Sequence, residues 1–288
     1  MMGRAAATEA PIRRSPVGRL RTWLDSTLQS PDTVRVSPPP TTGRYEFKYL
    51  IRQEQCESIA DLLATHLELD KYGHGRPRDT YTVRSIYYDS PGFKCYHEKE
   101  NGDECRRKYR VRTYNETDTN ALFLECKHRR GATYAKRKIR LDDDAMAGIA
   151  ERRGIDPSIA DPTSVLGQLL VGMDRWDYSP VSLVVYDRVA YVWPGQEDAV
   201  RVTFDRNLRA ALFPSLKRIR SEQDLVPLLY GWVILEVKFN DLVPRFMRQL
   251  IASHDLQRQA CSKYALSISQ LLDEHPTKKE GWNHVHVL

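Results

Sequence analysis

The chain has 288 residues, a mass of 33.3 kDa, a formal net charge of +6 and a pI near 9.0. Its 41% hydrophobic content is enough for a real core, and no apolar run approaches the roughly 18 to 20 residues that cross a bilayer. The positive charge indicates a polyanionic partner such as nucleic acid, anionic lipid or a phosphate compound. Five scattered cysteines without metal-binding spacing favour reduced thiols and a cytoplasmic protein.

The chain is expected to have three parts. Residues 1–42 form a Pro- and Arg-rich tail that admits one short amphipathic helix from Gly18 to Ser30. A folded domain is expected at residues 43–273, followed by a polar tail at residues 274–288.

Alternation and helical spacing predict the elements of this domain. Charged and apolar residues alternate, as in half-buried strands, at about 44–50, 80–89, 106–112, 123–129, 134–141, 181–193, 201–208 and 231–239. Apolar residues recur at helical spacing at about 53–66, 162–175, 243–253 and 259–272, and Asp142 suits the start of a further helix. The order lacks βαβ alternation, and the chain has neither a GxGxxG nor a Walker loop.

Basic residues occupy every second position in three successive strands, at 106–112, 123–129 and 134–141. Because neighbouring side chains of a strand point to opposite faces, each strand gains a basic face backed by an apolar or mixed one. The apolar face must be covered by helices, and the charged face must remain in contact with water. An antiparallel barrel of about eight strands, closed into a tunnel with a charged interior and covered by helices, meets both needs. The expected fold class is α+β.

Two readings of the charged residues follow. A single basic face could be an ordinary solvated sheet surface, but like charges on adjacent strands repel, so their recurrence favours a bound polyanion. Among the cations, Glu46, Glu125 and Glu236 either neutralise their neighbours or hold a hard divalent cation that bridges to phosphates. The residues alone leave both roles open.

Seven segments, in order, resemble the catalytic domain of the vacuolar transporter chaperone (VTC) family. They are RYEFKY at 44–49, SIYYD at 85–89, KYRVRTY at 108–114, FLECK at 123–127, RVTFD at 201–205, LEVKF at 235–239 and SKYA at 262–265. That domain is a polyphosphate polymerase of the triphosphate tunnel metalloenzyme (CYTH-like) superfamily. The resemblance implies transfer of the γ-phosphoryl group of ATP to a growing polyphosphate chain, with Mn²⁺ or Mg²⁺ as cofactor.

The resemblance also implies roles for individual residues. The catalytic set that grips phosphate would be Lys48, Arg110, Arg112, Lys127, Lys138, Arg188, Arg201 and Lys263. Further phosphate binders would be Arg44, Lys108, Lys136, Arg140 and Lys238, and the metal ligands would be Glu236, Glu46 and Glu125. Except for Lys263, which only the resemblance supports, these residues lie on the faces that alternation marks.

One departure bears on the reaction. The first strand reads Arg-x-Glu-x-Lys where other tunnel enzymes carry Glu-x-Glu-x-Lys, which favours chain synthesis or phosphate binding over a two-metal triphosphatase. A metal-dependent hydrolase of triphosphate or polyphosphate and a non-catalytic polyphosphate binder stay open as alternatives. The expected partners are ATP, pyrophosphate and polyphosphate; nucleic acid is not expected, because aromatic residues do not interleave with the basic ones. A membrane-protein partner would act in trans.

Overall fold

The computed structural model describes residues 44–114, 121–130, 133–142, 145–146, 149, 157–240 and 242–274. The chain divides into two compact units, residues 1–38 and 39–288, and every described residue belongs to the second. The helix expected at 18–30, most of the helix expected after Asp142 and the tail after residue 274 lie outside the described residues.

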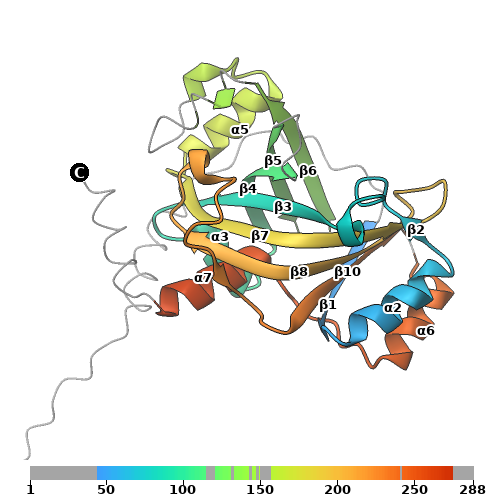
Figure 1. Ribbon diagram of the computed structural model, residues 1–288. Coiled ribbons are helices and arrows are strands. Elements are labelled where there is room, and N and C mark those ends of the chain that lie inside the picture. The colour runs from blue at the N-terminus through green and yellow to red at the C-terminus, as the bar shows by residue number, and fades with distance from the viewer. Residues whose placement is uncertain are drawn as a thin grey trace, which may run out of the picture. The chain divides into compact units, whose positions relative to one another are not determined.

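Ten antiparallel strands form one sheet (Figure 1). Eight of them follow the order β1-β10-β8-β7-β3-β4-β5-β6, while β2 pairs with β7 and β9 pairs with β8. The strands are β1 (Arg44–Arg52), β2 (Glu68–Leu69), β3 (Tyr81–Asp89), β4 (Cys105–Tyr114), β5 (Leu122–Arg130), β6 (Thr133–Leu141), β7 (Ser179–Val192), β8 (Val200–Leu212), β9 (Val226–Pro227) and β10 (Trp232–Asn240). All eight predicted strands are therefore present, and only the two-residue strands were not predicted.

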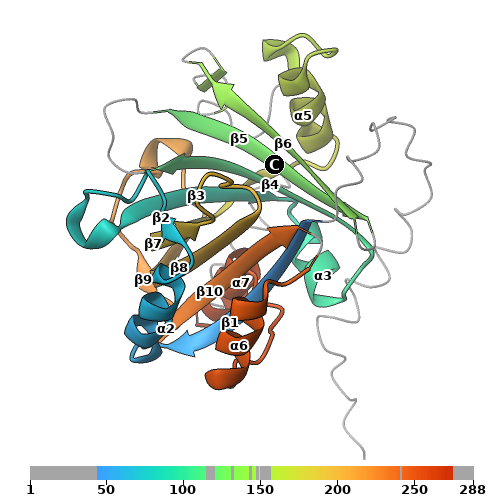
Figure 2. The ribbon, with the colours of Figure 1, turned by 90° about the vertical axis from the view of Figure 1, so that its right-hand side faces the viewer.

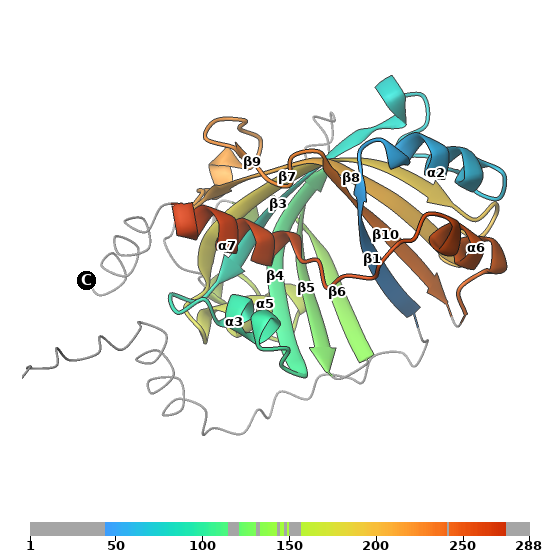
Figure 3. The same cartoon turned by 90° about the horizontal axis from the view of Figure 1, so that it is seen from below.

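The sheet is curved, as Figure 3 shows, but it is not closed. Strands β1 and β6 stand at its two edges, and they do not pair with each other in the described part of the chain. The antiparallel α+β class is confirmed, whereas the predicted closed barrel is not. A side-chain contact spans the opening instead, because Lys127 Nζ of β5 lies 2.9 Å from Glu46 Oε2 of β1.

Five helices accompany the sheet in the described ranges, namely α2 (Gln55–Ala64), α3 (Lys94–Glu100), α5 (Val165–Asp174), α6 (Arg245–Ser253) and α7 (Lys263–Glu274). Single 3-10 turns occur at Pro77–Asp79, Pro157–Ile159 and Leu216–Arg218. Helix α3 was not predicted, because its seven residues are too few and too polar for a helical period to appear. None of these helices has the length and apolar character needed to cross a membrane.

Two apolar clusters hold the helices on the sheet. Helices α2 and α6 lie side by side in Figures 1 and 2 and cover β1, β8 and β10, where Ile59 and Val202 are fully buried. The other cluster joins α5 and α7 to the strands from β3 to β7. Helix α7 contacts the opposite face of the sheet from α2, because Ser267 Oγ lies 2.7 Å from Ser182 Oγ of β7.

Candidate functional site

One face of the sheet gathers the basic residues that alternation predicted. The register sets Lys48 opposite Glu236 and Arg110 opposite Glu125, and residues paired in this way share a face. The Lys127 contact with Glu46 places this face on the inside of the curve, and we call it the inner face. Twelve of the predicted basic residues lie on it or against it, namely Lys48, Lys108, Arg110, Arg112, Lys127, Lys136, Lys138, Arg140, Arg188, Arg201, Lys238 and Lys263, and the register places Arg52, Arg106 and Arg129 on the same face.

Only five carboxylates make ion pairs with these cations among the described residues. They are Glu46, Asp70, Glu125, Asp205 and Glu236. Positive side chains on the inner face therefore outnumber the carboxylates that pair with them in the described structure. Arg44 falls on the same face by its register, but its side chain lies outside what the structure describes.

The first ion-pair group joins β1 and β10. Lys48 Nζ lies 3.0 Å from Glu46 Oε1 and 3.7 Å from Glu236 Oε2, and Lys238 also pairs with Glu236. Burial opposes ionisation of Glu46, but the surrounding lysines lower its pKa to about 2. Burial likewise opposes ionisation of Glu236, and the lysines hold its pKa well below the ordinary value. Both carboxylates are thus anionic at neutral pH.

The second group joins β7, β8 and α7 through Asp205. Arg188 donates from Nε and Nη2 to the two oxygens of Asp205, at 2.6 and 2.9 Å, and Lys263 Nζ lies 2.5 Å from Oδ2. Asp205 is 1% exposed, and although burial opposes its ionisation, both cations lower its pKa. Lys263 is the first residue of α7, and it lies buried inside rather than on the solvent side of its helix.

The third group joins β4, β5 and β6. Arg110 donates to Glu125 Oε2 from Nε (2.8 Å) and Nη2 (2.6 Å), and Lys136 Nζ lies 2.9 Å from the other oxygen. Lys138 does not join an ion pair of the described residues; its ammonium lies 3.9 Å from the centre of the Phe123 ring. Exposed lysines therefore line the β6 edge of the sheet, next to the Arg110–Glu125 ion pair.

Arg201 and Arg112 differ in how their positive charge is balanced. Arg201 pairs with the buried carboxylate of Asp70 and donates to Tyr81 Oη at 3.1 Å. Arg112 is 6% exposed, yet it donates only to neutral oxygens in the described structure, to Ser85 Oγ at 2.9 Å and to Tyr186 Oη at 3.3 Å. Arg112 is thus a buried cation that has no carboxylate partner within the described ranges.

Lys108 is a second cation of this kind. Its Nζ donates to Ser262 Oγ at 2.7 Å, and no carboxylate of the described residues pairs with it. Burial lowers the pKa of Lys108 to about 8, and Lys48 and Lys127 add to the effect. The remaining predicted binder, Arg140, is exposed on β6 opposite Phe123.

The sequence did not predict roles for Asp205, Tyr186, Tyr87 or Ser262. Tyr186 Oη lies between Arg112 and Arg188, at 3.3 and 3.4 Å, and Tyr87 Oη accepts from Arg110 at 3.3 Å. Burial opposes ionisation of Tyr87, but the neighbouring cations lower its pKa to about 8. Alternation places Asp205 on the same strand face as Arg201, but no feature of the sequence assigned it a role.

Buried contacts fix the start of α7 beside these cations. Tyr264 donates to Asp89 Oδ2 at 2.5 Å, and the Tyr264 ring stacks on Tyr87 with centroids 5.2 Å apart. Asp89 also accepts backbone N–H groups of Ser90, Cys95 and Tyr96, so one carboxylate ties the end of β3 to both α3 and α7. Through Tyr264, the next residue, Asp89 helps to hold Lys263 beside these cations.

The predicted metal ligands do not gather as one group. No three His, Cys, Asp or Glu side chains lie together in a way that could hold a metal ion within the described ranges. Glu125 pairs with Arg110 and Lys136, whereas Glu46 and Glu236 share Lys48. Thr203 lies directly opposite Glu236, and its hydroxyl is buried without a hydrogen-bond partner in the described structure. Two carboxylates and this hydroxyl are hard oxygen donors that fit Mn²⁺ or Mg²⁺.

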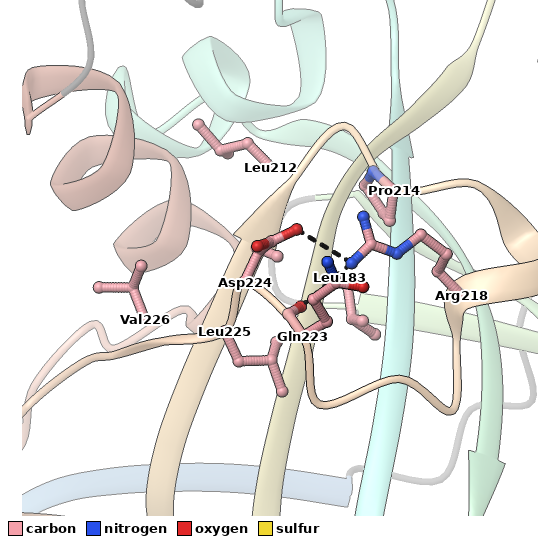
Figure 4. A pocket seen from close by; sticks show the side chains of 9 residues that line it. Leu183, Leu212, Pro214, Arg218, Gln223, Asp224, Leu225 and Val226 are labelled. Atoms are coloured by element: carbon pink, nitrogen blue, oxygen red, sulfur yellow. Dashed lines mark hydrogen bonds and ion pairs between the residues drawn. The ribbon is translucent and has the colours of Figure 1, made fainter.

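A hollow of about 340 Å³ lies elsewhere, where the segment before β9 meets β7 and β8 (Figure 4). Arg218 and Asp224 form an ion pair of 3.0 Å at its rim. It contains none of the predicted site residues, and Leu183, which lines it, points away from the inner face. We therefore place the candidate site on the inner face and not in this hollow.

Two solved structures are similar to the chain, and both are described as a "putative adenylate cyclase". One, from Bacillus halodurans, is 11% identical with a TM-score of 0.43 and covers 76% of this chain and 95% of its own. The other, from Vibrio parahaemolyticus, is 12% identical with a TM-score of 0.40 and covers 78% and 98%. The VTC domain matches residues 43–272, which is most of the chain, and the protein therefore belongs to the VTC domain family.

Proposed function

We propose that the chain is an ATP-dependent polyphosphate polymerase, which transfers the γ-phosphoryl group of ATP to a growing polyphosphate chain on the inner face. The observation that carries the proposal is the excess of cations over carboxylate partners on one face of the described sheet. Such an excess is unfavourable unless an anion offsets the repulsion. Membership of the VTC family supports a phosphate polymer as that anion.

Phosphoryl transfer suits a site of this kind. The reaction asks mainly for positioning and for stabilisation of charge on phosphate oxygens, and it needs no protein nucleophile. Arg112 and Lys108 on β4 are ready to bind phosphate without first leaving a carboxylate. Arg110 and Arg188 would exchange Glu125 and Asp205 for phosphate oxygens, while their bidentate geometry already suits an oxyanion.

The donor set suits a divalent cation next to these groups. Glu236 and Glu46 would hold Mn²⁺ or Mg²⁺, with Thr203 as a neutral neighbour, after Lys48 and Lys238 turn toward phosphate. Such an ion supplies charge neutralisation of the phosphates when bound. Glu125 is better explained as the counter-ion of Arg110 and Lys136.

The test is incubation of the purified protein with ATP and Mn²⁺, with and without pyrophosphate, followed by gel electrophoresis and phosphorus NMR. We expect polyphosphate ladders and a matching amount of ADP. Release of free phosphate without chains would instead assign a hydrolase, and salt-sensitive polyphosphate binding without turnover would assign a binding module. Reversing the charge of Arg110 should abolish binding of polyphosphate in each case.

A further inference from the structure

We propose that Ser262 is a phosphoryl acceptor, which takes the γ-phosphoryl group of ATP and gives the protein a first primer of its own. The inference rests on the proposed function and deepens it, because it names a chemical group of the chain on which synthesis can start. Ser262 precedes α7, and its Oγ lies 2.7 Å from Nζ of Lys108. A serine hydroxyl beside a lysine amine is an arrangement that activates serine as a nucleophile.

The surroundings of Ser262 favour this role. Residues 261–263 each contact the charged network: the Cys261 carbonyl accepts from Lys48 at 3.2 Å, Ser262 meets Lys108, and Lys263 pairs with Asp205. Ser262 is therefore flanked by two residues that contact the charged network, and Lys108 is the cation that reaches its hydroxyl. A phosphate oxygen that reaches this hydroxyl meets the positive charge of Lys108, as transfer requires.

Lys108 can serve as the base because no carboxylate of the described residues pairs with it and stabilises its charged form. The groups that act on it are Tyr87 from β3, Lys48 from β1, Lys127 from β5 and Cys95 from α3. Burial together with the two lysines lowers the pKa of Lys108 to about 8, so roughly a tenth of the side chain is neutral at pH 7. A lysine in an ordinary surface ion pair has no comparable neutral fraction.

The step balances without any further reactant. Ser262 Oγ attacks the γ-phosphorus of ATP and forms an O–P bond. The bond from that phosphorus to the β–γ bridging oxygen breaks, and ADP leaves with the electron pair. The hydroxyl proton passes to Nζ of neutral Lys108, which is then charged and pairs with the new phosphoserine. The product keeps its place at the start of α7.

The plain alternative is that Ser262 only caps α7. Its carbonyl accepts from the backbone N–H of Leu266 at 2.9 Å, and its hydroxyl accepts from that of Ala265 at 3.4 Å. An asparagine keeps this capping but has no hydroxyl. Ser262→Asn thus separates a cap from an acceptor, and Ser269→Ala, on the same helix, is the control for a serine outside the site.

The experiment uses the full chain, ATP labelled at the γ-phosphate and Mn²⁺, without pyrophosphate, and the reaction is quenched in denaturant. We expect an acid-stable, base-labile label on the peptide that contains Ser262, and no label in Ser262→Ala or Ser262→Asn. Lys108→Arg keeps the charge but cannot lose a proton, so labelling should fall about 100-fold. In the wild type the labelling rate should rise as the pH rises to about 8.

The outcomes separate the two proposals. Free polyphosphate and ADP without any protein label would overturn the acceptor role of Ser262 and leave the polymerase intact. Label that persists in Ser262→Asn would also overturn it, because another residue would be the acceptor. If neither chains nor label appear although the protein is folded, the polymerase proposal fails and the inference fails with it.

Discussion

Replacing Arg112 by methionine should make the protein more stable and less able to bind a polyanion. Arg112 is buried, donates to the hydroxyls of Ser85 and Tyr186, has no ion pair with a carboxylate of the described residues, and experiences the like charge of Arg110. An unpaired buried charge costs more than two neutral hydrogen bonds return, so an apolar side chain of similar length should raise the free energy of unfolding by about 1–3 kcal/mol.

The same substitution should weaken binding of polyphosphate. Loss of one desolvated charge contact typically costs about 2–5 kcal/mol, which is roughly a 30-fold or greater fall in affinity. Thermal unfolding measures the first effect, and titration of polyphosphate at fixed salt measures the second. A rise in stability together with a loss of affinity would mean that this cation is kept for a ligand.

The control is Arg209→Met. Arg209 lies on the opposite face of β8, where its Nε donates to Glu222 at 2.9 Å. Because that arginine already has a carboxylate, its loss should not stabilise the protein, and it should leave the affinity for polyphosphate unchanged. The reasoning is refuted if Arg112→Met lowers stability and binds polyphosphate as tightly as the wild type.

Three further predictions concern Glu236, Asp89 and Gly167. Glu236→Gln should abolish turnover but keep most polyphosphate binding, because it frees Lys48 and Lys238 and weakens the site for a hard cation. Turnover and polyphosphate binding are measured on one preparation. Normal turnover would show that Glu236 is not a metal ligand. Burial raises the pKa of Asp89 to about 6, so the folded state binds its proton more tightly than the unfolded state does. Stability relative to Asp89→Asn should therefore be highest below about pH 4 and fall by about 3 kcal/mol as the pH rises from 4 to above 6, and a flat difference in denaturant melts would contradict this. Gly167→Ala should destabilise the protein by about 1–3 kcal/mol, because a Cβ there would lie 2.0 Å from the Asp161 carbonyl oxygen, and an unchanged melting temperature would refute the clash.

The sequence predicted which residues share a face, because the period of a strand is two and does not depend on the rest of the fold. Lys48, Arg110 and Lys127 lie on one face for that reason. The same local rule cannot say whether the sheet closes. Closure depends on whether β1 reaches β6, and β6 carries only Lys136, Lys138 and Arg140 on its described inner face, so direct pairing with β1 would bring lysines together.

Contacts between distant segments could not be predicted. The pair between Lys127 and Glu46 joins residues 81 positions apart and depends on the curvature of the whole sheet. Lys263 was expected on a helix at 259–272, where a lysine usually faces solvent, and only the resemblance gave it a role at the site. Arg258 instead bridges to Tyr49, residues 259–262 are not helical, and the helix begins only at Lys263. Because the helix starts only at Lys263, Ser262 and Lys263 lie at the inner face.

The carboxylates of the inner face make binding an exchange and not an addition. When a phosphate takes Arg188 or Lys263, Asp205 loses its partner; when the phosphate departs, the original pair forms again. Each release of a phosphate is therefore favoured by the ion pair that forms again. The net binding free energy for any one phosphate is smaller than the number of cations suggests. A polymer held in this way can advance by small steps, since no single position retains it strongly enough to stop it.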